Sequence, residues 1–224
     1  MKKIAILTGQ KYFLNIESFL FCKYRRNLPV FTHHFSNESF LTYDVVVCIN
    51  YDQIIKGNDE FWKNETRAKI INIHTGLPQY PGSNPWFWSV LEGEENGVTV
   101  HEINSNKVDC GGILWWQELD DYDREYLTGS QLRERLFELA KENLVAVIDM
   151  AENDSLPPAS TEIKWNGTKR KVSDMKAMFC LDEDALNSDV FRLLMAASSD
   201  DHDNCFFLGD DGEKFWVNLQ IKRE

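Results

Sequence analysis

Short apolar runs rich in β-branched residues alternate with longer segments through the first third of the chain. Residues 3–8 form one such run, and residues 44–49 form the most strongly β-branched one. Continuous apolar runs of this length are typical of strands that are buried on both faces of a parallel sheet. Residues 16–22, between the two runs, have the spacing of a helix. Because parallel strands need crossover connections, this alternation predicts a βαβ layout and an open, mostly parallel α/β sheet.

Four further segments are strand candidates. Residues 29–35 and 69–73 have strand composition and extend the expected parallel sheet. Residues 97–103 alternate apolar and polar side chains, and residues 112–119 carry Trp115 and Trp116. Alternation is typical of antiparallel strands, so we expect these last two to be an antiparallel addition to the sheet.

One long amphipathic helix is expected after the strands. Apolar residues recur at helical spacing over residues 130–151, and Ser130 is the candidate N-cap. A helix of this length can cover one face of the sheet, so we expect it to close the main domain.

The pattern changes after Pro157 and Pro158. Two hairpin signals, Asn166-Gly167 and Asp211-Gly212, flank a helix-like segment at residues 189–197. We therefore expect two units, which are a main domain over residues 1–151 and a small α+β appendage over residues 152–224.

Charge and composition exclude several classes of protein. The chain has 24 Lys and Arg against 36 Asp and Glu, a net charge of −12, which argues against a nucleic-acid partner. Its apolar runs are far shorter than the roughly 20 residues of a membrane-spanning helix, and the first residues lack a secretory signal pattern. Its five scattered cysteines, with no C-x-x-C pair, suggest reduced thiols and no metal site. We expect a soluble, cytoplasmic protein.

Polar residues gather near the end of the fourth strand candidate. Asn72 and His74 are two residues apart at its carboxyl end, so their side chains share one side of the strand. Ligands of open α/β sheets bind at that edge. A loop rich in proline and glycine follows, and Asp109 precedes Gly111 and Gly112, where a ligand can approach the backbone closely. This constellation predicts a ligand site.

The same segment resembles the folate-dependent formyltransferases. The resemblance is strong over residues 69–120 and looser in residues 152–224. It implies a Rossmann-like formyltransferase fold, with residues 1–151 as the catalytic domain. It rests on Asn72-Ile73-His74, Leu77-Pro78, Tyr80-Pro81-Gly82, Asn84-Pro85, Gly93-Glu94, Gly97-Val98-Thr99-Val100-His101 and Asp109-Cys110-Gly111.

The resemblance also implies roles for individual residues. Asn72, His74 and Asp109 would be the catalytic trio, with 10-formyltetrahydrofolate as the formyl donor. The Asn72 amide would donate to the formyl oxygen, His74 would accept the proton of the attacking amine or act only electrostatically, and Asp109 would orient the imidazole. The folate would contact Asn50, Tyr51, Gln53, Ile54, Cys110, Gly111 and Gly112. The acceptor would contact Gln10, Lys11, Tyr80, Gly82, Asn84 and Trp86.

The branches of this family differ in their acceptors. Chains that resemble methionyl-tRNA formyltransferase carry a longer, basic C-terminal domain, whereas the tail here is short and acidic. Glycinamide ribonucleotide formyltransferases hold a phosphate in a Gly/Ser/Asn-rich loop, whereas residues 8–13 here read TGQKYF. The motif at residues 84–88 resembles the nucleotide-sugar N-formyltransferases. We therefore expect formyl transfer to the amine of a dTDP- or GDP-linked amino-dideoxysugar for a surface polysaccharide, such as a lipopolysaccharide O-antigen.

Two alternatives stay open at this point. One is transfer to a small non-sugar amine such as glycinamide ribonucleotide, and the other is a catalytically inactive relative that acts as a binding protein. For the nucleotide, we expect Phe215 or Trp216 to stack on the base and Lys169 or Arg170 to meet the diphosphate. A homodimer is a further expectation, because enzymes of this size often pair.

Overall fold

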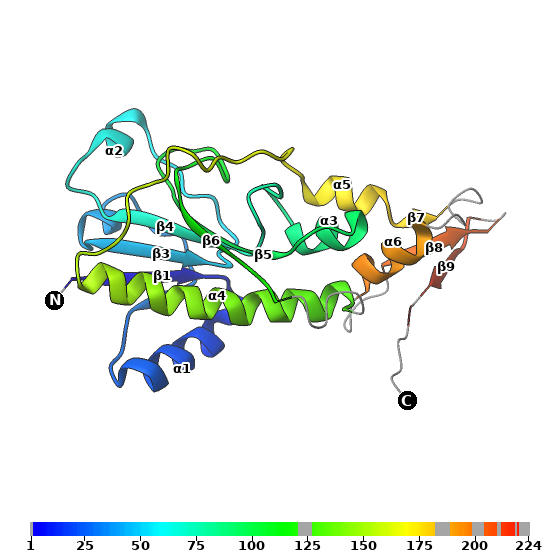
Figure 1. Cartoon of the computed structure of the whole chain (residues 1–224), viewed down its shortest axis with the longest axis horizontal. Coiled ribbons are helices and arrows are strands. Elements are labelled where there is room, and N and C mark those ends of the chain that lie inside the picture. The colour runs from blue at the N-terminus through cyan, green and yellow to red at the C-terminus, as the bar shows by residue number, and fades with distance from the viewer. Residues whose placement is uncertain are drawn as a thin grey trace.

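The computed structural model describes residues 2–120, 127–181, 189–198, 204–209, 212–217 and 219. The β-branched runs form the middle of a six-stranded sheet in the order β2-β1-β3-β4-β5-β6 (Figure 1). Its strands are β1 (Ile4–Thr8), β2 (Val30–Phe31), β3 (Val45–Ile49), β4 (Lys69–His74), β5 (Gly97–Glu102) and β6 (Ile113–Glu118).

The sheet is parallel from β2 to β4 and antiparallel from β4 to β6. The predicted α/β class, the parallel core and the antiparallel addition are therefore confirmed. Strand β2 is shorter than the run at residues 29–35, since only Val30 and Phe31 pair with β1.

Two long helices cover one face of the sheet. Alternate strand residues such as Ile6, Val47 and Ile73 pack with α1 (Phe13–Tyr24) and α4 (Gly129–Glu152) in one buried cluster. Helix α4 runs along most of the molecule (Figure 1). The apolar side of α4 faces these buried strands, as predicted.

The opposite face has a less regular cover. Two short 3-10 helices, η1 (Gln10–Tyr12) and η2 (Ser39–Leu41), and the five-residue helix α2 (Asp59–Lys63) lie in the loops between strands. Phe40 and Phe61, with loop residues, pack on the strand residues of this face. On β4 that face begins with Ile70 and then carries Asn72 and His74. The apolar cover therefore ends where the polar pair begins.

Helix α4 begins earlier than predicted. Its N-cap is Thr128, which accepts a hydrogen bond from the Gln131 backbone N–H while the Gln131 side chain accepts one from the Thr128 N–H. The predicted N-cap Ser130 is wrong, because Ser130 lies inside the first turn and donates its backbone N–H to the Ser198 carbonyl.

The chain after α4 crosses back over the sheet before it forms the appendage. Residues 153–171 run across the top of the sheet in Figure 1 and lead into α5 (Val172–Ala177). The Asn166-Gly167 signal does not form the predicted hairpin. Residues 165–168 contain no strand, and Gly167 packs against the Gln79 carbonyl, where a side chain would clash.

The appendage is built on a three-stranded sheet in the order β7-β8-β9. The antiparallel pair β8 and β9 confirms the second hairpin signal, with Gly212 at φ 81° in its turn, while Asp211 lies outside the described residues. The elements are β7 (Cys180–Leu181), α6 (Asp189–Ala197), β8 (Cys205–Leu208) and β9 (Lys214–Val217). Much of the acidic stretch at residues 182–213 also lies outside the described part.

The appendage shares a core with the main sheet's loops. Helix α3 (Pro85–Glu92) follows β4, and its Phe87 and Trp88 are buried together with Leu193 and Ala196 of α6. The division at residues 151 and 152 stays a prediction, and this shared cluster shows that the two units are packed together.

Three further observations concern the described residues. None of their helices is both long and apolar enough to cross a membrane. They contain no group of three His, Cys, Asp or Glu side chains that is arranged to hold a metal. The five cysteines are free thiols.

The contribution of the shared cluster to stability can be tested. Phe87 is fully buried, so Phe87→Ala should lower the free energy of unfolding by about 3–5 kcal/mol. Phe215→Ala is the matched control, because the Phe215 side chain is 58% exposed, and it should cost less than about 0.5 kcal/mol. Urea unfolding measures both, and equal effects would contradict the packing described here.

Candidate functional site

The predicted trio comes together on the face of the sheet that lacks α1 and α4. Asn72 and His74 lie on β4, and Asp109 comes from the loop between β5 and β6. The His74 Nδ1 is 3.6 Å from the Asp109 Oδ2. Both side chains are nearly buried, with 8% and 5% exposed. The structure therefore juxtaposes three residues that lie up to 37 positions apart in sequence (109 − 72).

A second histidine completes this cluster. His101 is the cross-strand partner of Asn72 in the antiparallel register of β4 and β5. Its Nε2 lies 3.0 Å from the Asn72 Nδ2 and 3.4 Å from the Asp109 Oδ1. Two imidazoles thus share one carboxylate. His101 lies in one of the family-like motifs but had no predicted role, although its position on an alternating strand was a usable signal.

Backbone carbonyls decide which ring nitrogens carry protons. The His74 Nε2 must donate to the Tyr80 carbonyl at 2.8 Å, so in the neutral ring the Nδ1 lone pair faces Asp109. The His101 Nδ1 must donate to the Glu102 carbonyl at 3.0 Å, so its neutral Nε2 accepts from the Asn72 amide. The Asn72 amide is thereby oriented, and one of its N–H groups stays free to meet a ligand.

Asp109 is held in place by the loop that follows β4. Its Oδ2 accepts the Gly82 backbone N–H at 2.7 Å, and its own backbone is left-handed, with φ 41°. Gly82 has φ 102°, and a Cβ there would strike the Arg170 backbone, so the position requires glycine. Burial raises the pKa of Asp109, but the neighbouring His74 and His101 and the Gly82 N–H outweigh burial and hold that pKa well below its ordinary value.

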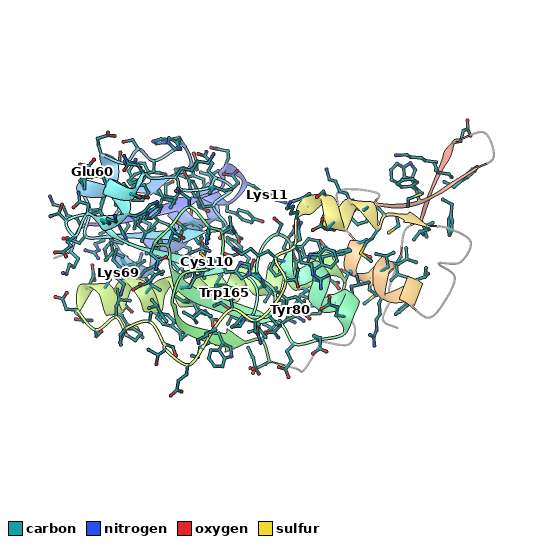
Figure 2. All side chains as sticks on the ribbon, turned by 90° about the horizontal axis from the view of Figure 1, so that it is seen from above. Lys11, Glu60, Lys69, Tyr80, Cys110 and Trp165 are labelled. Carbon is teal, nitrogen blue, oxygen red and sulfur yellow. The ribbon has the colours of Figure 1, made fainter. Side chains whose placement is uncertain are left out.

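Residues 153–171, which we call the crossing segment, cover the two histidines. The Trp165 ring meets His101 edge-on at 4.9 Å and His74 at 5.6 Å between ring centroids. Its indole N–H donates to the Gly111 carbonyl at 2.9 Å. Figure 2 shows Trp165 beside Cys110 over the middle of the molecule. No sequence signal pointed to Trp165, because its contact with the site depends on where the crossing segment lies.

A cavity of about 620 Å³ opens beside this cluster. It is lined by the trio and His101, and also by the loop after β3 and the start of α3. Several residues that were predicted to bind folate or acceptor line it, namely Asn50, Tyr51, Gln53, Ile54, Gly82, Asn84 and Trp86.

Other predicted ligand contacts are not among the residues that line this cavity. The Tyr80 side chain is buried in the cluster with α6, where its hydroxyl is hydrogen-bonded to Glu92. Lys11 lines a second cavity, and Gln10 lies next to it in η1. A side chain at Gly111 would clash with the Glu102 carbonyl, and a side chain at Gly112 would clash with Ala159. Cys110 is exposed beside Ser105. Those glycines thus serve the chain's own packing.

Arg170 is engaged elsewhere. Its guanidinium pairs with Glu92 and lies 4.3 Å from the centre of the Trp88 ring, and its backbone bridges to Gly82. This arrangement ties the crossing segment to the loop that positions Asp109. The expectation that Arg170 meets a diphosphate is therefore not supported by its position.

Comparison with known proteins agrees with this geometry. A family model described as formyl transferase matches residues 33–148, over half of the chain. The chain belongs to the formyl transferase family. The family identified from the motifs is confirmed.

Individual relatives are distant. The dTDP-4-amino-4,6-dideoxyglucose formyltransferase of Mycobacterium bovis is 24% identical over 160 residues, which cover 70% of this chain and 66% of that protein. The match thus spans just under two thirds of that relative's length. A 4-N formyltransferase from Francisella tularensis has a TM-score of 0.79 at 21% identity, with 100% of this chain and 99% of that chain covered. It shows that the fold extends over the whole chain.

A third relative was crystallised with ligands. The formyltransferase of Anoxybacillus kamchatkensis, in complex with UDP-4,6-dideoxy-4-formamido-L-AltNAc and tetrahydrofolate, has a TM-score of 0.60 at 21% identity. The alignment covers 85% of this chain and 96% of that chain. At this identity the likeness again shows the fold.

The shared carboxylate predicts a specific dependence of stability on pH. Folded Asp109 has a lower pKa than an unfolded aspartate, for which about 4 is ordinary, so the unfolded chain binds more protons as the pH falls. The stabilisation by ionised Asp109 is complete above about pH 5 and is lost as the pH falls toward about 2. Asp109→Asn should lower the free energy of unfolding at pH 7 by on the order of 2 kcal/mol.

Urea unfolding of both proteins at a series of pH values measures this effect. The difference between wild type and Asp109→Asn should narrow below about pH 4. A difference that is constant from pH 7 to pH 3 would show that the Asp109 carboxylate contributes no pH-dependent stability.

Proposed function

We propose that this protein is an N-formyltransferase that moves a formyl group from 10-formyltetrahydrofolate to the amine of a nucleotide-linked amino-dideoxysugar. The observation that carries the proposal is the juxtaposition of Asn72, His74 and Asp109 at the wall of an open cavity. A hydrogen-bond donor, a base and a carboxylate in one place are what acyl transfer to an amine requires.

The cavity suits a flat, partly apolar donor such as a folate. Ile54 and Val108 line it and are 54% and 41% exposed, so they present apolar surface to the cavity. A pterin would cover both, and the polar loop at Asn50 and Gln53 would hydrogen-bond its edge. This part of the wall supports folate as the donor class. The folate supplies the formyl group as an amide on a nitrogen that can leave.

His74 is placed to take the proton of the attacking amine at its Nδ1. Its Nε2 proton is committed to the Tyr80 carbonyl, so Nδ1 is the basic nitrogen. When Nδ1 is protonated, the imidazolium faces Asp109 at 3.6 Å, and that carboxylate is ionised because its pKa is held low. The same proton can then pass to the leaving nitrogen. Asp109 therefore stabilises the charged intermediate form of His74.

Asn72 is placed to stabilise the charge that develops on the formyl oxygen. His101 accepts one N–H of its amide, which leaves the other N–H directed by a fixed rotamer. His101 is thus a positioning residue for Asn72, and Trp165 restrains both histidines from the other side. A preorganised donor of this kind contributes roughly 3 kcal/mol to transition-state stabilisation.

The acceptor is inferred from similarity and from the charge of the appendage. The mycobacterial relative is named for a dTDP-amino-dideoxysugar, and the Anoxybacillus relative holds a UDP-linked formamido sugar. The appendage here carries no excess of basic residues for tRNA. A role in surface polysaccharide synthesis, in the cytoplasm, is part of the same proposal.

A product assay tests the acceptor class. Incubation with 10-formyltetrahydrofolate and a panel of dTDP-, UDP- and GDP-linked 3-amino and 4-amino dideoxysugars should give one product heavier by one formyl group in mass spectrometry. Glycinamide ribonucleotide is the competing acceptor in the panel. Formylation of that compound alone, or of none, would reject the sugar acceptor.

Variants of the trio test the mechanism. His74→Asn and Asp109→Asn should lower kcat by roughly 10²- to 10⁴-fold, because proton transfer loses its base or the ion that stabilises it. Asn72→Ala should lower kcat by roughly 10²- to 10³-fold. His34→Asn, an exposed histidine away from the cavity, is the matched control. Near-normal turnover of a folded trio variant would remove that residue from the mechanism.

A further inference from the structure

A second cavity of about 560 Å³ adjoins the first. The two cavities share Tyr12 and Arg133 in their walls. The first lies over the face that carries Asn72 and His74, while the second lies between η1, α1 and the start of α4. Tyr12 and Arg133 therefore mark the point where a long ligand would pass from one cavity to the other.

Arg133 is the cation at this junction. Its guanidinium lies 5.9 Å from the centre of the Trp86 ring, at the start of α3. Among the residues that the structure describes, no carboxylate lies within ion-pair distance of Arg133, although this chain has 36 acidic residues. A planar guanidinium with all its donors uncommitted to carboxylates is suited to bind phosphate oxygens.

The other cation of the first cavity is Lys107, in the loop with Asp109. That loop is tied to the loop after β3, because the Asn106 side-chain amide accepts a hydrogen bond from the Gly57 N–H and donates one to the Gly57 carbonyl. Lys107 therefore belongs to the wall assigned to the folate. Arg133 belongs to the wall that also holds Trp86 of α3.

We propose that Arg133 binds the diphosphate of the acceptor and that the second cavity takes its nucleoside. This inference rests on the proposed function, since it assumes an acceptor with an amine at one end and a nucleoside diphosphate at the other. The amino sugar would then lie in the first cavity, with its amine at His74. The diphosphate would cross the junction beside Tyr12.

The second cavity has the groups that a nucleoside requires. Tyr12 and Phe137 form an aromatic wall, with ring centroids 4.6 Å apart. The amides of Asn15 and Gln131 offer N–H donors for a base, since the Gln131 oxygen already accepts from Thr128. Asn15 already accepts from Lys141 through its Oδ1, which leaves its N–H groups for a ligand.

The charges that face this cavity are mixed, and Arg133 is the one at the junction with the first cavity. Lys11, Arg133 and Arg135 are its cations, and Glu134 and Glu138 are its carboxylates. Glu138 is paired with Lys141 at 2.6 Å. Local cations rather than the net charge of −12 therefore decide how the acceptor's diphosphate is received.

Binding of free nucleotides tests the proposal without catalysis. Isothermal titration of the intact protein with dTDP, UDP and GDP should show binding of at least one of them. Arg133→Met should weaken that binding by at least about tenfold, and Arg133→Lys should restore part of it. Lys107→Met is the matched control for nucleotide binding, because it removes the other Lys or Arg side chain of the first cavity, which does not line the second cavity, and should leave nucleotide affinity unchanged.

Steady-state kinetics separate this inference from the proposed function. With an accepted amino sugar, Arg133→Met should raise KM for the nucleotide sugar at least about tenfold while kcat and KM for the folate stay near the wild-type values. No binding of any nucleoside diphosphate to wild type, or equal losses in Arg133→Met and Lys107→Met, would overturn the role of Arg133. If nucleotides bind as expected but no sugar is formylated, the acceptor site stands and the proposed reaction fails.

Discussion

The Asp109 carboxylate is the interaction on which the rest of the site depends. It faces two imidazoles and accepts the backbone N–H of Gly82, so one buried charge links β4, β5 and the loop after β4. A buried carboxylate is costly unless it is surrounded by donors and positive charge. The Gly82 N–H supplies a donor, the two imidazoles supply positive charge in their protonated forms, and together they hold the pKa of the carboxyl low. The geometry and the electrostatics of the candidate site therefore have the same origin.

The two faces of the sheet explain why the site lies where it does. On β4 the residues Ile71 and Ile73 pack toward α4, while Asn72 and His74 point to the other face. There the cover of the sheet changes from aromatic side chains to the loop after β4 and the crossing segment. Trp165 then separates the histidines from solvent on one side, and the cavity leaves them open on the other. Polar residues are buried here at low cost because each has a partner.

The appendage contributes to the site indirectly. Its core joins α6 to Phe87 and Trp88 of α3, and Arg170 stacks on Trp88 while its backbone bridges to Gly82. Gly82 in turn donates to Asp109. The tail thus supports the loop that positions the carboxylate. An acceptor that spans both cavities would use the junction at Arg133 rather than the exposed hairpin of β8 and β9.

The sequence by itself determined the sheet class, the antiparallel addition and the long helix, which follow from local periodicity over a few neighbouring positions. The two-residue spacing along a strand placed Asn72 and His74 on one side. Their grouping with Asp109 was implied by the family resemblance. Only the tertiary structure decided that His101 pairs with Asn72, because strand register is set by packing between distant segments. The same holds for Trp165, which reaches the histidines only because the crossing segment lies over them, and for Arg133, which lines both cavities because of where the start of α4 packs. Arg170 shows the converse, since its charge suggested a ligand contact and its neighbours Glu92 and Trp88 engage it instead.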